Sequence, residues 1–120
     1  MITERRQVIF SNEAVKEAVR LFASLHPDKM PHGQIRRVWT VSEPELQLVV
    51  QVEKAGARQL IDLVFTQGEA AAFLILFCRK NKVPLPRSAD KFLELENGCL
   101  SLVITKQILT ENLSSTRSSN

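Results

Sequence analysis

The chain has 120 residues, of which 44% are hydrophobic and 24% are charged, and its formal net charge at pH 7 is +3. These values are typical of one soluble globular domain with its own core. They exclude a membrane-spanning helix, because the longest apolar run is far shorter than the ~20 residues that a span needs. They also argue against a dedicated nucleic-acid-binding protein, which carries a denser positive charge.

The first half of the chain predicts a strand, a helix and a three-stranded meander. Residues 7–10 are β-prone, and Ser11 is a residue type that caps helices before the one-sided amphipathic pattern of 12–25. Two prolines and a glycine indicate a loop over 26–34. Alternating apolar residues then predict strands over 35–41, 46–53 and 59–65, separated by turns.

The second half predicts a helix followed by a hairpin. Thr66 and Glu69 have the spacing of a capping box, and the helix that they open ends near Asn81. Two prolines keep residues 83–87 extended. Asn97–Gly98 stands between two β-prone runs, 92–96 and 99–104, and predicts a tight turn between two strands.

The resulting order, β-α-β-β-β-α-β-β, predicts an α+β fold. We expect a two-layer sandwich with one mostly antiparallel sheet and both helices on one face. The domain is expected to span residues 1–109, and the polar residues 110–120 are expected to form a disordered tail.

The second predicted helix is apolar on every side over residues 70–78, whereas a helix on one sheet has a single apolar stripe. The 12–25 helix can cover only part of this surface. We therefore expect a second copy of the chain to cover the rest, with Phe73, Leu76 and Phe77 in a dimer interface.

Positive residues gather directly after this helix, with Asp90 the only anion among them. They are Arg79, Lys80, Lys82, Arg87 and Lys91. Arg36 and Arg37 join them if that strand end lies nearby. This pattern is typical of a surface for phosphates or an acidic partner, although helix C-capping followed by a solvated loop explains the same residues. No aromatic residue is interleaved to stack on bases.

One four-residue motif, His26–Pro27–Asp28–Lys29, resembles the signature of J-domain co-chaperones, which engage an Hsp70 partner. The resemblance covers these residues alone. J-domains are all-helical, whereas strands are predicted after this motif, so we interpret it as a loop that ends a helix. His26 and His32 are interpreted as surface residues, and no metal is expected.

Motifs for catalysis are not visible in the sequence. There is no nucleophile motif, no glycine-rich phosphate loop and no C-x-x-C, and the chain has no tyrosine. Asp62 is expected on the solvent face of its strand and Trp39 in the core. Cys78 and Cys99 are expected as free thiols in a cytoplasmic protein without a signal peptide, and no cofactor is expected.

These observations favour a small non-enzymatic interaction or regulatory domain that is homodimeric and binds a protein partner. Two alternatives remain open at this point. One is a nucleic-acid-associated protein that uses the basic segment 79–91, and the other is a small-ligand-binding domain or minor enzyme with a pocket between helices and sheet.

Overall fold

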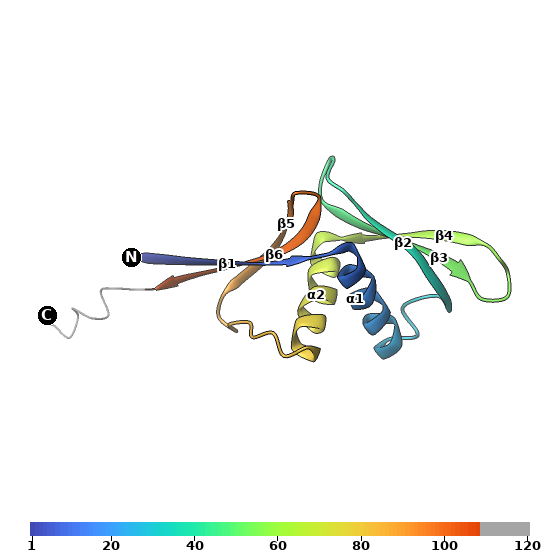
Figure 1. The fold of residues 1–120 in the computed structure, drawn as a ribbon, viewed down its shortest axis with the longest axis horizontal. Helices are drawn as coiled ribbons and strands as arrows, with labels where there is room; N and C mark the ends of the chain where they lie inside the picture. The colour runs from blue at the N-terminus through green and yellow to red at the C-terminus, as the bar shows by residue number, and fades with distance from the viewer. Residues whose placement is uncertain (109–120) are drawn as a thin grey trace, which may run out of the picture.

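The computed structural model describes residues 1–108, which form an α+β fold of six strands and two helices (Figure 1). In chain order the elements are β1 (Ile2–Phe10), α1 (Asn12–Leu25), β2 (Gly33–Val41), β3 (Gln47–Lys54), β4 (Leu60–Thr66), α2 (Gln67–Lys80), β5 (Asp90–Glu96) and β6 (Cys99–Ile108). The α+β class is confirmed. The predicted tail at 110–120 lies outside the described residues.

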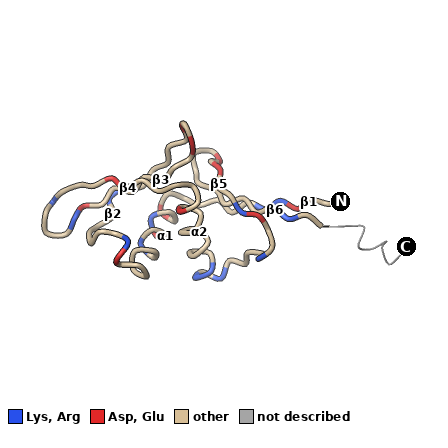
Figure 2. Tube along the Cα trace, turned by 180° about the vertical axis from the view of Figure 1, so that it is seen from behind, with Lys and Arg blue, Asp and Glu red and all other residues tan. Residues whose placement is uncertain are grey.

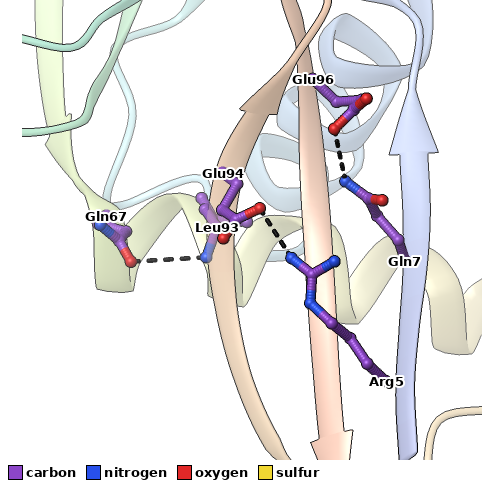
Figure 3. A network of polar contacts seen from close by, with 6 residues as sticks. All are labelled: Arg5, Gln7, Gln67, Leu93, Glu94 and Glu96. Carbon is purple, nitrogen blue, oxygen red and sulfur yellow. Dashed lines mark hydrogen bonds and ion pairs between the residues drawn. The ribbon is translucent and has the colours of Figure 1, made fainter.

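The six strands are divided between two antiparallel sheets of three strands each, so the prediction of one sheet needs correction. One sheet is the predicted meander, β2–β3–β4. The other has the order β1–β6–β5. Where the sheets approach each other, the Leu93 N–H of β5 donates to the side-chain oxygen of Gln67 (3.4 Å), so a side chain takes the place of a neighbouring strand (Figure 3).

The local signals in the sequence act where they were predicted. The Ser11 hydroxyl accepts a bond from the Ala14 N–H (3.1 Å) at the start of α1. At the start of α2, the Thr66 hydroxyl accepts from the Glu69 N–H, and the Glu69 carboxylate accepts from the Thr66 N–H. Asn97–Gly98 joins β5 to β6 with φ values of 51° and 80°, the left-handed conformation that a two-residue hairpin turn requires.

Helix α2 lies in the middle of the core, which explains why it is apolar all round. The Phe73 ring packs against Phe22 of α1 (4.4 Å between centroids) and against Phe65 of β4 (4.9 Å). The Phe77 ring faces Phe10 of β1 (6.4 Å). Figure 1 shows α1 and α2 packed together on one side of the strands. The apolar surface of α2 is therefore buried by α1 and by both sheets of the same chain.

This burial removes the reason for which a dimer interface was predicted on α2. Phe73 is only 2% exposed and has almost no surface to offer a second copy. Leu76 and Phe77 are half-buried, and Phe77 packs against the core. An apolar helix is thus no longer a reason to place a second copy on this face. Neither helix within residues 1–108 is long and apolar enough to cross a membrane.

The face of the β1–β6–β5 sheet that points away from the helices is closed by polar bridges between its outer strands. Arg5 donates to Glu94 (2.9 Å), and Gln7 donates to Glu96 (3.2 Å), both across the central strand β6 (Figure 3). Beneath them, Ser101 of β6 has no exposed surface, and its hydroxyl has no hydrogen-bond partner among the described residues.

Candidate anion-binding site

A hollow of about 650 Å³ lies between the last turns of α2, the segment 81–89 and the start of β5. Its lining residues are Ile75, Arg79, Leu85, Pro86, Arg87 and Lys91. Three of these are cations, and they come from α2, from the connecting segment and from β5. Figure 2 shows Lys and Arg positions along the end of α2 and the loop that leads to β5. We call this feature the cationic hollow.

The end of α2 turns the chain back so that both walls of the hollow can form. The Val83 N–H donates to the Cys78 carbonyl oxygen (2.8 Å), and the Lys82 N–H donates to the Arg79 carbonyl oxygen (3.2 Å). With Lys82 at φ 60°, these bonds form a Schellman motif, although glycine usually occupies the left-handed position. The motif directs Val83 and Leu85 onto the core.

The segment that follows α2 is held in place along its length. The Arg6 guanidinium of β1 donates to the Pro84 carbonyl oxygen (3.0 Å). Ala89 is buried, and the Lys91 ammonium donates to the Ala89 carbonyl oxygen (3.1 Å). The wall that carries Arg87 is therefore an ordered part of the fold.

The charge of the hollow is not neutralised within the part of the chain that the structure describes. No carboxylate in residues 1–108 lies within ion-pair distance of Arg79, Arg87 or Lys91. Asp90 is adjacent to Lys91 in the sequence, but successive side chains of a strand point to opposite faces. In the strand register Asp90 lies opposite Thr105, and Thr105 lies opposite Arg5. Asp90 is therefore on the same face of the sheet as Arg5, the face away from the hollow.

The remaining cations of the predicted site are placed elsewhere. Lys80 and Lys82 are exposed at the end of α2 and extend its positive surface, but they do not line the hollow. Arg36 and Arg37 lie on β2, in the other sheet. Arg36 pairs with Glu53, and the Arg37 guanidinium lies over the Trp39 ring (4.7 Å). These two arginines are therefore removed from the site.

Two kinds of residue in or beside the site were missed from the sequence. One is the aliphatic wall formed by Ile75, Leu85 and Pro86. The other is Arg6, which fastens the segment from the far strand of the sheet. Arg6 lies opposite Ile104, which in turn lies opposite Lys91. Only the pairing of β1 with β6 brings Arg6 to this place, and no local pattern signals that pairing.

A smaller cavity of about 260 Å³ lies where the two sheets approach each other beside α1. Its lining residues include Asn12, Trp39, Thr40 and Cys99, and Trp39 is half-buried. The prediction that Trp39 is a core residue is wrong, because Trp39 is only half-buried and its ring packs against the Arg37 guanidinium outside the core cluster.

Asp62 and the two cysteines lie as the sequence predicted. Asp62 is exposed and accepts a bond from Gln51 (3.3 Å). Cys78 and Cys99 are free thiols, and burial raises the pKa of the Cys78 thiol. The His26 loop ends α1 and leads into a strand, as expected for a loop outside a J-domain. No group of three or more His, Cys, Asp or Glu side chains in residues 1–108 is arranged to hold a metal ion.

Comparison with protein-family models, curated proteins and solved structures finds no match to this chain.

Proposed function

We propose that this chain is a non-enzymatic interaction domain that holds an acidic segment of a protein partner in the cationic hollow. The observation that carries the proposal is the convergence of Arg79, Arg87 and Lys91 on one hollow, without a carboxylate from the described residues to pair with them. Unpaired cations that share a concave surface raise the local concentration of anions and form charge-assisted hydrogen bonds with them.

The walls of the hollow favour a peptide over a nucleic acid. Ile75, Leu85 and Pro86 offer an aliphatic surface for an apolar side chain, and no aromatic ring lines the hollow for base stacking. The two arginines present planar forks that match carboxylates. The ligand is thus an acidic peptide segment that also carries apolar side chains.

Fluorescence anisotropy with labelled peptides tests this function. The probe is a peptide of alternating Glu and Leu, and its matched control has every Glu replaced by Gln. We expect the acidic peptide to bind and the neutral peptide not to bind. Because surface electrostatics are screened within about 10 Å at 0.1 M salt, affinity must fall as salt is raised.

The variant for this test is Arg79→Ala/Arg87→Ala/Lys91→Ala, and we expect it to lose at least about tenfold in affinity. The matched control is Arg20→Ala/Lys54→Ala/Arg58→Ala, which removes the same charge from exposed positions outside the hollow. An equal loss of affinity in both variants would show that only the net charge of the chain matters, and it would contradict the proposal. Tighter binding of a single-stranded RNA of equal charge would support the nucleic-acid alternative instead.

The cavity between the sheets supports a second candidate function, the binding of a small ligand. Its lining combines apolar core residues such as Phe10 and Leu100 with the polar residues Thr40 and Asn12, a mixture that suits a small molecule with one polar group. A rise in melting temperature with a metabolite pool, lost in Thr40→Val, is the expected result for this candidate. An unchanged melting temperature across the pool would argue against it.

A further inference from the structure

The outer edge of β4 presents backbone groups that no strand of the described residues pairs. The Lys54 N–H donates to the Gln59 carbonyl oxygen (2.8 Å) at the β3–β4 turn, which makes this a hydrogen-bonded pair. Bonded pairs alternate along an antiparallel ladder, so Leu60, Asp62 and Val64 direct their N–H and C=O groups away from β3. Figure 1 shows this end of the meander projecting beyond the helices.

The other three edge strands within residues 1–108 carry features that discourage pairing with a further strand. Strand β1 has three consecutive charged residues, Glu4 to Arg6. Strand β2 has adjacent arginines at an irregularity in its register. Strand β5 has four charged residues, and the Gln67 side chain occupies its Leu93 N–H.

Strand β4 lacks all of these features. Its sequence LIDLVFT has one charge and no Lys, Arg or Pro, and its pairing with β3 has a continuous register. Leu60 and Val64 are 55% and 57% exposed on the face away from the core. An apolar edge strand with free hydrogen-bonding groups is a surface for another strand.

We propose that this strand is a second copy of β4, so that two chains associate edge to edge with β4 antiparallel to itself. The polarity of residues 60–64 reads the same in both directions. Asp62 stands between Leu60 and Val64 on the outer face, and Ile61, Leu63 and Phe65 are all apolar on the inner face. An antiparallel copy centred on Asp62 therefore sets Leu60 against Val64 on the outer face and Ile61 against Leu63 on the inner face, with the two Asp62 side chains opposite each other.

The surface beside β4 is also complementary to itself in charge. A hollow of about 220 Å³ lies next to Phe65, with Phe22, Ala72 and Phe73 as its apolar lining and with Lys29 and Glu69 at its rim. A two-fold axis brings the same surface of both copies together, so a cation and an anion on that surface can face their opposites. A strongly basic or strongly acidic strand of another protein would instead face either Lys29 or Glu69 with a like charge, which is unfavourable.

Light scattering behind a size-exclusion column tests the association. Over concentrations from about 1 μM to about 1 mM, the mass should rise from the 13.6 kDa of one chain to twice that value. A mass of one chain throughout this range would overturn the proposal.

Paired lysine variants test whether β4 is the contact. We expect Leu60→Lys/Val64→Lys to weaken association at least about tenfold, since each dimer gains four cations at the shared edge. The matched control is Ile2→Lys/Ile9→Lys, because both isoleucines lie on the edge strand β1 and are each 54% exposed. Association that is unchanged in the β4 variant, or weakened equally in both, would contradict the assignment.

Two substitutions at Asp62 are expected to act in opposite directions. Asp62→Pro removes an N–H that faces away from β3, so the monomer tolerates it while the partner strand loses a donor. The control Thr3→Pro removes the corresponding outward N–H of β1 and should leave association unchanged. Asp62→Asn should tighten association roughly two- to fivefold, because the two carboxylates lie close together on one face of the joined sheet.

A weaker association in Asp62→Asn would show that Asp62 faces a cation of the second copy, and it would overturn the pairing of β4 with itself. If circular dichroism shows that Asp62→Pro is unfolded, the Asp62→Asn and lysine variants still decide between the two outcomes.

Discussion

The Val83 N–H donates to the Cys78 carbonyl oxygen (2.8 Å), and this bond joins the two walls of the cationic hollow. It ends the helix that carries Arg79 and starts the segment that carries Arg87. The same turn places Lys82 at φ 60°, where an L-residue is strained and glycine is not.

Lys82→Gly is therefore expected to raise the free energy of unfolding by up to about 1 kcal/mol, through relief of the left-handed strain. Urea denaturation followed by circular dichroism measures the change. A decrease of more than about 0.5 kcal/mol would show that Lys82 makes a contact that outweighs the strain. Binding of the acidic peptide should change little, because Lys82 does not line the hollow.

Phe73 and Leu76 are expected to respond very differently to truncation, although both belong to the apolar run of α2. Phe73→Ala removes a ring that packs between Phe22 and Phe65, and should lower the free energy of unfolding by about 3–5 kcal/mol. Leu76→Ala should lower it by less than about 1.5 kcal/mol, since Leu76 is only half-buried. A loss of association in Leu76→Ala would restore the helix as a dimer interface.

Two serine-to-alanine substitutions are expected to have opposite signs. Ser101→Ala removes a fully buried hydroxyl that has no partner among the described residues, and stability should stay equal or rise by up to about 1 kcal/mol. Ser11→Ala removes the N-cap bond to the Ala14 N–H and should lower stability by about 1 kcal/mol. A clear loss in Ser101→Ala would mean that this hydroxyl has a partner.

The buried thiol of Cys78 predicts a loss of stability in alkaline solution. Burial raises the pKa of this thiol above its ordinary value of 9.0, so the folded chain keeps the proton that the unfolded chain releases. The contribution is complete below about pH 9 and is lost as pH rises through the pKa of the folded state. Urea denaturation between about pH 8 and about pH 10.5 should show a steeper decline in the wild type than in Cys78→Ala.

The parts of the fold that were predicted correctly depend on short-range chemistry. The capping box of Thr66 and Glu69, and the Asn97–Gly98 turn, each act within four residues, so their sequence signals are sufficient. The pairing of Ile2 with Ile108 has no such signal. The division into two sheets depends on how α2 packs, which no local pattern specifies.

The candidate site was predicted in part for the same reason. Arg79, Arg87 and Lys91 are close in sequence, and their shared charge marks the segment. The sequence could not show that Arg36 and Arg37 lie away from this cluster, because the position of β2 relative to α2 depends on tertiary packing. The Arg6 contact to Pro84 joins residues that are 78 positions apart in the sequence, so the sequence could not predict it either.

The most direct test of the cationic hollow is an amide ¹H–¹⁵N NMR titration of the wild-type chain with the alternating Glu–Leu peptide. We expect saturable shifts over residues 75–91, largest near Arg79, Arg87 and Lys91, and no comparable shifts on β2. Shifts that centre on Trp39 and Cys99, or shifts of equal size for the Gln-substituted peptide, would contradict the account.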